Sequence, residues 1–438
     1  MADESRLIRL LQVAPRFSAF PTTGAELRIF HLAVQLARHM SVTHLGFALP
    51  EFAHAPHPGA ERVEFVPVSR QGSYRIIDLA RGAAGSVPFS VLNYTRDSMK
   101  TAVRCRLETG RFDIVMLESI HLAAYLPLVR AARYPPRAVV CDWHNIESEV
   151  LARYSDGRVG LMRRLYGRHT AQRLASYERW FVNQCDMHVV VSERDRDALI
   201  RYGCRAPIIV VDNGVDVARF TESEPQAPDR RNRVLYVGSM DALQNADAAV
   251  FFASNVWPDI RRALPGSVFT IVGRNPPREV RNLARLEGVE VTGTVDDVRP
   301  YYRQAFAAVV PLRVAGGTRL KILEAMAAGV AVVSTRRGAE GLHITPDVHY
   351  LLADDATAMR AAVQELARDG AKRERLVAAA RTLVQQRYDW PVLADLLAAS
   401  LLELLGSRDA CPIDPSRVGD ARERAMNLPR GSHNDRMR

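Results

Sequence analysis

The stretch "GGTRLKILEAMAAG", Gly316 to Gly329, places two cations and one carboxylate in a run of otherwise small or apolar residues. Apolar runs flank it on both sides, "AFAAVVPL" at 305–312 and "VAVVST" at 330–335, and both have the length and composition of buried strands. The three segments together predict a strand, a helix and a second strand, the repeating unit of a parallel sheet. Thr318 is the expected N-cap of the helix and Gly329 its expected C-cap.

The charges in this stretch indicate a ligand site. Arg319 and Lys321 fall in the expected first helical turn, where the helix dipole disfavours a positive charge by about 0.3–1 kcal/mol. Free N–H groups together with two cations favour an anion, most simply a phosphate. Glu324 lies among apolar neighbours and needs a hydrogen-bonding partner if it is buried, such as a ligand hydroxyl. The alternative is an internal ion pair between Lys321 and Glu324 on a structural helix.

The whole chain has the composition of a soluble globular protein. Its 438 residues, 47% hydrophobic and 25% charged, suggest two or three domains. No uncharged apolar run reaches the roughly 18 residues that span a bilayer, and residues 1–16 carry charges where a signal peptide needs apolar residues. We therefore expect a cytoplasmic protein. Five scattered cysteines without CxxC spacing indicate neither a zinc site nor a disulfide framework.

Strand patterns and helix patterns alternate in two series, which predicts two parallel α/β sheets. We expect one domain over 1–219 and a second over 233–385, joined by a polar linker at 220–232 that contains two prolines. A helix over 386–405 is expected to cross back onto the first domain. The polar tail 406–438 has no apolar period, so we expect it to be disordered.

The net charge of +10 is concentrated in the segment 157–180. Arginines alternate there with residues such as Leu165, Tyr166 and Trp180. Such a segment fits an anionic membrane surface or an acidic acceptor. The alternative is a solvated helix face. Nucleic acid is not an expected partner, because the chain shows no nucleic-acid motif and acidic residues balance most of its basic ones.

Six blocks along the chain carry a family resemblance. They are, in order, "VVVSERDRDAL", "VVDNGVDVARF", "LYVGSM…N.DA", "FTIVGRNPP", "VTGTVDDVRPYY" and "GGTRLKILEAMAAGVAVVSTRRGAEGL". In their order and spacing the chain resembles the retaining group 1 (family 4-like) glycosyltransferases of the GT-B fold, over about residues 7–405. The resemblance implies two Rossmann-like doubly wound domains that face a cleft. The first would lie on the acceptor side, and the second would bind a nucleotide-diphosphate sugar.

The resemblance also implies donor-side residues. Glu324 matches a glutamate that binds the ribose hydroxyls, and the preceding loop would hold the diphosphate. The matching donor-side positions are Gly238, Ser239, Arg274, Thr294, Gly316, Gly317, Thr318 and Glu324. For Arg274 an ordinary surface arginine is the alternative, and the side chain of Thr294 is expected to matter little because the base is held there by backbone groups.

At two places the chain departs from the family pattern. Gly316 stands where the family commonly has a second glutamate, which contacts the sugar, and "VGSMDALQN" at 237–245 lacks the usual arginine and lysine. Arg319 and Lys321 are expected to neutralise the diphosphate instead. The chain thus resembles a subgroup with a "GGTRLK" signature, and the identity of the donor sugar stays open.

In the first domain, His144 follows an apolar strand at the sheet edge where open α/β sheets bind ligands. It matches the family's cleft histidine, which approaches the transferred sugar, and a satisfied loop histidine is the alternative. Glu118 and His121 follow another strand and are expected to line the acceptor side, with solvent exposure as the alternative.

Gly24 lies in the first strand-to-helix loop, where the family brings the backbone close to the acceptor or the diphosphate. An ordinary turn glycine is the alternative. Two charged residues follow, Glu26 and Arg28, and the alternative for them is an ion pair on the surface.

The resemblance implies transfer of a sugar, with retention, onto a lipid-linked or saccharide acceptor. His144, Arg319 and Lys321 are the expected catalytic residues, and we expect no cofactor and no metal, since no DxD-like box has a supporting context. We expect the protein at the inner face of the membrane if the basic segment binds lipid. A nucleotide-sugar 2-epimerase and a catalytically silent nucleotide-sugar-binding protein remain alternatives. A dehydrogenase is disfavoured because no strand precedes a GxGxxG sequence.

Overall fold

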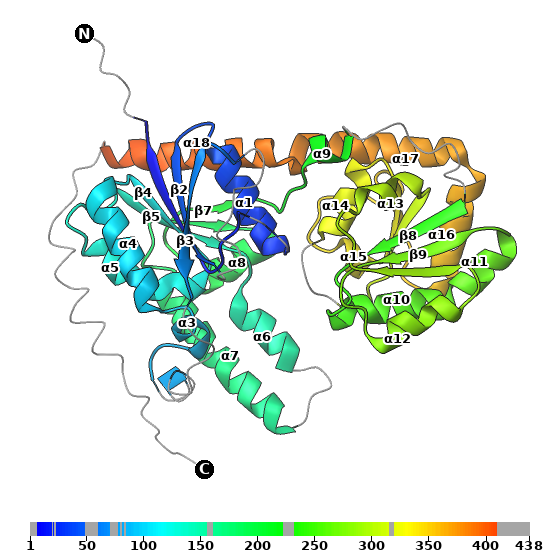
Figure 1. Ribbon diagram of the computed structural model, residues 1–438, viewed down its shortest axis with the longest axis horizontal. Helices are drawn as coiled ribbons and strands as arrows, with labels where there is room; N and C mark the ends of the chain where they lie inside the picture. Colours follow the sequence, from blue (N-terminus) through cyan, green and yellow to red (C-terminus); the bar gives the residue numbers. More distant parts are fainter. Residues whose placement is uncertain are drawn as a thin grey trace, which may run out of the picture. The chain divides into compact units, whose positions relative to one another are not determined.

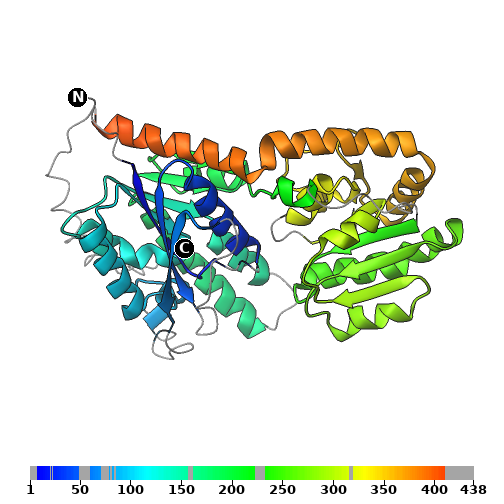
Figure 2. The ribbon, with the colours of Figure 1, turned by 45° about the horizontal axis from the view of Figure 1, so that its top comes forward.

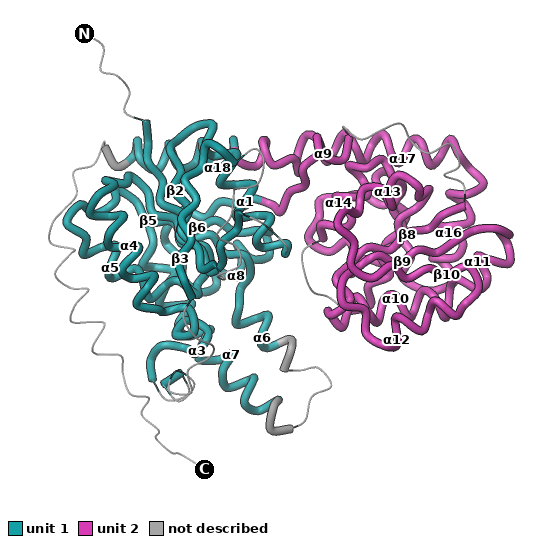
Figure 3. Tube along the Cα trace, viewed as in Figure 1, with its two compact units in different colours: residues 1–211, 395–438 teal, residues 212–394 magenta. Residues whose placement is uncertain are grey.

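The computed structural model describes residues 7–19, 21, 23–48, 60–70, 78, 81–82, 85–155, 161–221, 232–314 and 319–409. The chain forms two compact units, shown in Figure 3. Unit 1 comprises Met1–Val211 and Asp395–Arg438, and unit 2 comprises Asp212–Ala394. The sequence-based domain boundaries at 219 and 386 fall inside unit 2. Most of the expected linker and tail lies outside the described residues.

Unit 1 is built on a seven-stranded parallel sheet, with strand order β3-β2-β1-β4-β5-β6-β7. The strands are β1 (Arg9–Ala14), β2 (Ser41–Ala48), β3 (Val63–Ser69), β4 (Ile114–Glu118), β5 (Ala138–Trp143), β6 (Met187–Val190) and β7 (Ile208–Val210). Most of β1, β2, β4, β5 and β6 is buried, as expected for a parallel sheet covered on both faces. The strand order reverses between β1 and β4, and open α/β sheets bind ligands at such a point.

Helices follow these strands. They are α1 (Gly24–Leu36), α3 (Phe89–Leu92), α4 (Asp97–Gly110), η2 (Ile120–Tyr125), α5 (Leu126–Arg130), α6 (Glu147–Ser155), α7 (Leu161–Phe181) and α8 (Glu193–Arg201). Most of them pack on the sheet, whereas α6 and the first part of α7 extend away from it (Figure 1). A capping box fixes the start of α1: the Thr23 hydroxyl accepts from the Glu26 N–H at 3.3 Å, and the Glu26 carboxylate accepts from the Thr23 N–H at 3.2 Å.

Unit 2 repeats this plan with a six-stranded parallel sheet in the order β10-β9-β8-β11-β12-β13. Its strands are β8 (Arg233–Val237), β9 (Val268–Val272), β10 (Val289–Gly293), β11 (Ala307–Val310), β12 (Ala331–Ser334) and β13 (Leu351–Leu352). Its helices are α9 (Val217–Thr221), α10 (Leu243–Asn255), α11 (Trp257–Ala263), α12 (Arg278–Arg281), η4 (Asn282–Arg285), α13 (Arg299–Gln304), α14 (Leu320–Ala327), α15 (Arg336–Ala339), α16 (Ala356–Arg368), α17 (Gly370–Leu383) and η5 (Val384–Tyr388). The strand order reverses between β8 and β11. Two doubly wound parallel sheets were predicted, and both are confirmed.

The central helix α14 begins at Leu320, one residue later than expected, because Arg319 is its N-cap. Arg319 caps without a side-chain hydrogen bond, and Thr318 lies outside the described residues. Gly329 follows the C-cap with φ +70°, and the Gly329 N–H donates to the Met326 carbonyl at 3.1 Å. This left-handed turn favours glycine and ends the helix.

The last helix, α18 (Trp390–Asp409), starts in unit 2 and from Asp395 onward belongs to unit 1, along which it lies in Figure 2. Its window Trp390–Ser407 is long and apolar enough, by length and composition alone, to cross a membrane, and 44% of that window is buried. Asp395 accepts from His39 at 2.7 Å, and the Leu405 carbonyl accepts from Arg137 at 3.2 Å. These contacts fix α18 as a packing helix of unit 1.

Candidate functional site

At the carboxyl edge of the unit 2 sheet, the loops that follow β8 and β9 touch each other. The Gly238 N–H donates to the Val272 carbonyl at 3.0 Å, and the Met240 N–H donates to the Arg274 carbonyl at 3.0 Å. A Cβ atom on Gly273 would lie 1.7 Å from the Gly238 carbonyl oxygen. Only glycine at position 273 allows this approach, so the two loops form one surface at the switch point.

Lys321, in the first turn of α14, extends to this surface. Its Nζ donates to the Asn245 Oδ1 at 2.7 Å and to the Tyr236 hydroxyl at 3.3 Å, and it lies 4.7 Å from the centre of the Tyr236 ring. A Cβ atom on Gly238 would lie 3.0 Å from Nζ. Burial, and then the charge of Arg319, lower the pKa of Lys321 to about 7. An anion beside Gly238 would favour the protonated ammonium.

A row of hydrogen bonds connects Lys321 to Arg274. Asn245 accepts from Lys321 and donates through Nδ2 to the Ser239 carbonyl at 2.8 Å. The Ser239 hydroxyl accepts from the Arg274 Nε at 2.7 Å and donates to Asp241 at 2.7 Å. The structure thereby brings together four of the expected residues: Gly238, Ser239, Arg274 and Lys321. Sequence reasoning missed Asn245, whose amide joins them.

Glu324 lies one turn after Lys321 on α14, and its Oε2 accepts from the Tyr302 hydroxyl at 3.1 Å. Burial raises the pKa of Glu324, against the opposite effect of this hydrogen bond. Glu324 and Lys321 form no ion pair, so the alternative of an internal pair does not hold for these two described residues. Arg319 is bound elsewhere: its guanidinium contacts the Glu340 carbonyl at 3.3 Å and the Glu340 carboxylate at 3.5 Å.

Two further donor-side expectations concern Thr294 and residues 316–318. Thr294 is exposed directly after β10, where the preceding Gly293 carbonyl accepts from the Gly273 N–H at 3.2 Å. Gly316, Gly317 and Thr318 lie outside the described residues, so their assignment to the diphosphate loop stays a prediction.

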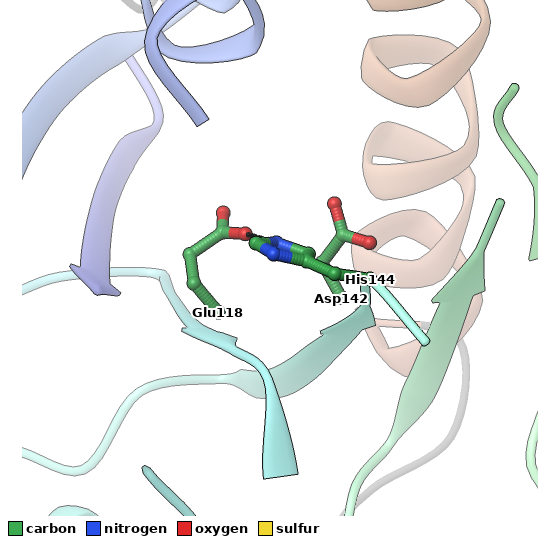
Figure 4. Close-up of side chains that lie close together, drawn as sticks. All are labelled: Glu118, Asp142 and His144. Carbon is green, nitrogen blue, oxygen red and sulfur yellow. Dashed lines mark hydrogen bonds and ion pairs between the residues drawn. The ribbon is translucent and has the colours of Figure 1, made fainter. Parts of the chain in front are cut away.

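Unit 1 holds a second cluster at its own switch point. Glu118 is the last residue of β4, and His144 follows β5 by one residue. The Glu118 Oε2 lies 2.7 Å from the His144 Nε2, and Figure 4 shows the imidazole ring directed at the carboxylate. Glu118 is fully buried and His144 is 8% exposed. The alternative of solvent exposure is therefore wrong for Glu118, and His144 has a charged partner.

The protonation of this pair follows from its surroundings. Burial raises the pKa of Glu118, and the Asp142 charge adds to that effect. For His144, burial alone would lower the pKa, but the hydrogen bond to Glu118 and the charges of Asp142 and Glu118 raise it overall. Both shifts favour a proton held by the pair, and we place it on His144 as an imidazolium that faces the Glu118 carboxylate.

Asp142, the other acidic residue of the cluster, is neutralised by Arg28 of α1. The Arg28 Nε and Nη2 donate to the two carboxylate oxygens of Asp142 at 3.0 and 3.2 Å, and Nη1 donates to the Val211 carbonyl at 2.8 Å. Arg28 is 1% exposed and Asp142 is fully buried. The alternative of a surface pair between Glu26 and Arg28 is wrong, because Glu26 forms the capping box and Arg28 is buried against Asp142.

Among the described residues, one group could hold a metal ion: Glu118, Asp142 and His144. Their possible ligand atoms all lie within 4.8 Å of one another. A cation there would have to displace the Arg28 guanidinium, which already occupies both oxygens of Asp142. These contacts favour two neighbouring ion pairs over a metal centre.

His121 and Gly24 lie outside this hydrogen-bonded cluster. The His121 Nδ1 is 2.7 Å from the Ser119 hydroxyl, and its ring centre lies 5.0 Å from that of Tyr94. Burial, and then the charge of His144, lower the pKa of His121 to about 4, so it is neutral at pH 7. Gly24 is the first residue of α1 and directly follows its cap. A role of either residue on the acceptor side stays a prediction.

Comparison with known proteins identifies both units. Residues 22–219 match the family model described as Glycosyltransferase Family 4, and residues 231–369 match the model described as Glycosyl transferases group 1. The chain belongs to the GT-B glycosyltransferases. The sucrose-phosphate synthase of Thermosynechococcus elongatus shares this fold, with a TM-score of 0.65 at 16% identity, over 92% of this chain and 100% of that one.

The structure of Anabaena Alr3699/HepE in complex with UDP is similar to the same degree, with a TM-score of 0.64 at 15% identity, over 90% of this chain and 100% of that one. Among curated proteins, a glycogen synthase of Mycobacterium tuberculosis is 27% identical over 250 residues, which is 53% of this chain. The matched region spans 59% of the length of that relative.

Proposed function

We propose that this GT-B protein is a retaining glycosyltransferase of the "GGTRLK" subgroup, which moves a sugar from a nucleotide-diphosphate sugar to a lipid-linked or saccharide acceptor. One observation carries the proposal: a row of hydrogen bonds joins the cations Lys321 and Arg274 at the switch point of unit 2. The Glu324 carboxylate lies one helical turn after Lys321 on α14. The UDP in the Anabaena structure and the polysaccharide named in the curated relative support this class of donor and acceptor.

The chemistry assigns a task to each group. Departure of a nucleoside diphosphate develops negative charge, and fixed cations and N–H donors that meet this charge contribute most to such a reaction. Lys321 and Arg274 supply the charge, and Glu324 accepts hydrogen bonds from the ribose hydroxyls. His144 donates a hydrogen bond to the transferred sugar or its phosphate. These side chains perform the task without a metal, so we propose a metal-independent enzyme.

The first experiment identifies the donor. The full chain is screened by thermal shift against UDP-, GDP-, ADP- and TDP-sugars, since a ligand that binds only the folded state raises the melting temperature. Turnover of the selected donor is then measured with saccharide and lipid-linked acceptors, with and without EDTA. We expect one base to be preferred, transfer to be insensitive to EDTA, and the anomeric configuration of the product, read by NMR, to match that of the donor.

Two substitutions test the site directly. Lys321→Met and Glu324→Gln are each expected to weaken donor binding and to remove most turnover. Lys372→Met and Glu365→Gln are the matched controls, because these two residues form a partly exposed pair with each other in the same unit. Equal activity of site and control variants contradicts the site. Epimerised sugar without an acceptor, or donor binding with no transfer to any acceptor, contradicts the proposed reaction.

We also propose that unit 1 rests on the inner face of an anionic membrane. Along the described part of α7, the exposed residues include Arg164, Leu165, Tyr166 and Arg168, with Leu165 55% and Tyr166 54% exposed. Cations beside exposed apolar side chains suit a charged lipid interface.

This proposal predicts sedimentation of the protein with vesicles that contain phosphatidylglycerol at low salt, and its loss at high salt. The double variant Arg164→Glu/Arg168→Glu should not sediment. The control Arg336→Glu/Arg337→Glu makes the same charge change on exposed arginines of unit 2 and should sediment as the wild type does. Sedimentation of both variants contradicts the proposal.

A further inference from the structure

A polar side chain lies in the middle of β1, the strand that forms the switch point of unit 1. Gln12 is fully buried between apolar neighbours of the same strand. Its amide contacts groups on three other elements: Glu118 at the end of β4, His44 on β2 and Ile29 on α1. A buried amide is costly unless it is hydrogen-bonded, so these partners explain why it is tolerated.

The partners fix which way the amide faces. Its nitrogen lies 3.4 Å from the Ile29 carbonyl oxygen, which can only accept a hydrogen bond, and 2.6 Å from the Glu118 Oε1. The Gln12 oxygen therefore faces the His44 Nδ1, at 2.8 Å, and must accept a proton from it. Burial holds the pKa of His44 at about 3, so His44 is neutral, carries its proton on Nδ1, and offers Nε2 to the Ser18 N–H at 3.4 Å.

We propose that Gln12 is a positioning residue: its amide donates to the Glu118 Oε1, keeps Glu118 ionised, and thereby holds His144 as an imidazolium with its second N–H available to a ligand. The inference rests on the proposed function for its consequence in catalysis, but the charge state itself is independent of any reaction. The remaining oxygen of Glu118 contacts the His144 Nε2, so both carboxylate oxygens accept a hydrogen bond.

The charges around His144 support this state. The ionisable groups that act on it or feel its charge come from five elements: Glu118 of β4, Asp142 of β5, Arg28 of α1, Glu147 of α6 and His121 of η2. Arg28 and Asp142 neutralise each other. An ionised Glu118 with a protonated His144 adds a second neutral pair, whereas an ionised Glu118 beside a neutral imidazole would leave a buried charge uncompensated.

Substitution of Gln12 should move the proton within the pair. In Gln12→Met the shape of the side chain is nearly retained, but the Glu118 Oε1 has lost its donor. The ionised carboxylate is then disfavoured, and the proton passes from His144 to Glu118, which leaves a neutral acid beside a neutral imidazole. The hydrogen bond that His144 donates to the sugar or its phosphate then comes from a neutral ring instead of a charged one and is roughly half as strong, so we expect kcat to fall about tenfold. KM for the donor should change less than kcat, because Lys321, Arg274 and Glu324, the proposed contacts to the diphosphate and the ribose, are unaffected.

The test is ¹⁵N NMR of the full chain labelled at histidine, with the His144 signals assigned from a His144→Gln variant. Wild type at pH 7 should show both ring nitrogens of His144 protonated, and Gln12→Met should show a neutral ring. His44→Phe is the second variant: the ring fits among the neighbouring aromatic side chains Phe17 and Phe65, but it cannot donate to Gln12, so a partial shift in the same direction is expected.

Thr43→Val is the matched control, because it removes another buried polar group from the same sheet, one that bonds Glu64 rather than Gln12. It should leave the His144 signals unchanged. An imidazolium that persists in both Gln12→Met and His44→Phe, or an equal change in Thr43→Val, overturns the proposal. Absence of sugar transfer with an intact wild-type imidazolium signal would instead contradict the proposed function and leave the role of Gln12 standing.

Discussion

Lys321 combines burial with a function that requires charge. Burial lowers the pKa of its ammonium in the folded protein to about 7, well below the usual value of 10.5, so this side chain loses its proton near neutral pH. An anionic diphosphate would favour the charged form and raise this pKa. Binding of a nucleotide sugar should therefore take up a proton and weaken as the pH rises through 7.

Calorimetry of nucleotide-sugar binding at pH 6 and pH 8.5, in buffers with different ionisation enthalpies, measures both effects. In Lys321→Met the affinity should be lower and the proton uptake should disappear. An affinity of the wild type that is equal at the two pH values would contradict a direct contact between Lys321 and the diphosphate.

The ion pair between Arg28 and Asp142 should dominate the local stability of unit 1. Asp142→Asn leaves the guanidinium of a 1% exposed arginine without its counter-charge, and removal of one partner from a buried pair typically costs about 3–5 kcal/mol. The double variant Arg28→Met/Asp142→Leu should be more stable than the single one. Urea midpoints measured by circular dichroism test this order.

The control for that series is Asp97→Asn, which breaks an exposed pair with Lys100 on α4. Exposed pairs contribute about 0–1 kcal/mol, so the midpoint should hardly move. A single variant Asp142→Asn that is as stable as Asp97→Asn would show that the pair in the core is dispensable.

At the scale of elements, helix α6 is joined to α7 through Glu178. The fully buried Glu178 carboxylate accepts from the Ser148 N–H at 3.1 Å and from the Ser148 hydroxyl, which also lies 3.0 Å from the Tyr202 hydroxyl. Burial raises the pKa of Glu178 to about 7. Since α6 begins three residues after His144, this carboxylate anchors the segment that carries the imidazole.

The raised pKa makes the free energy of unfolding depend on pH. The folded state holds a proton on Glu178 between pH 4.5, the usual pKa of a glutamate, and about 7, where the unfolded chain does not. The stability that this proton contributes is full below pH 4.5 and is lost as the pH rises through 7. Melting temperatures at pH 5 and pH 8 should differ less in Glu178→Gln than in the wild type, whereas Glu365→Gln should retain the wild-type difference.

The end of α14 provides a second test at this scale. Gly329 has φ +70°. An alanine is disfavoured in this left-handed conformation, so Gly329→Ala should lower the free energy of unfolding by about 1–2 kcal/mol. Gly406 lies inside α18 with open space around its Cβ position, where alanine should stabilise the helix by about 0.5–1 kcal/mol. Opposite shifts in melting temperature are expected for Gly329→Ala and Gly406→Ala, and shifts of equal sign would contradict the conformation assigned to Gly329.

For the whole molecule, the sequence predicts the architecture well because each strand of a covered parallel sheet is a short apolar run. It also predicts the residues at the strand ends, such as Glu118, His144 and Gly238, since those ends meet at one edge. It does not predict which of them bond to each other. The pair of Arg28 and Asp142 joins residues 114 positions apart, and only packing of α1 on the sheet brings them together.

One signal in the sequence was available for the missed residues. Gln12, His44 and Asp142 are polar side chains inside otherwise apolar strands, and a polar group in such a position needs a partner nearby. On unit 2, Asn245 belongs to the "LYVGSM…N.DA" block that carries the family resemblance, but nothing in that block indicates that its amide joins Lys321 to Ser239. The direction in which Arg319 turns, toward Glu340, depends on a residue 21 positions away and could not be inferred from the helix alone.

The chain passes from unit 1 to unit 2 after Val211 and returns to unit 1 at Asp395, within α18. During synthesis, unit 2 is therefore the first to have its complete sequence available, and it can fold as a continuous segment. The seven strands of unit 1 are synthesised early, but the unit is incomplete until α18 follows. Through Asp395 and the Leu405 carbonyl, α18 then contacts His39 and Arg137 of unit 1. Since domains generally fold as units while the chain emerges, the unit that is begun first on the ribosome is the one that is completed last.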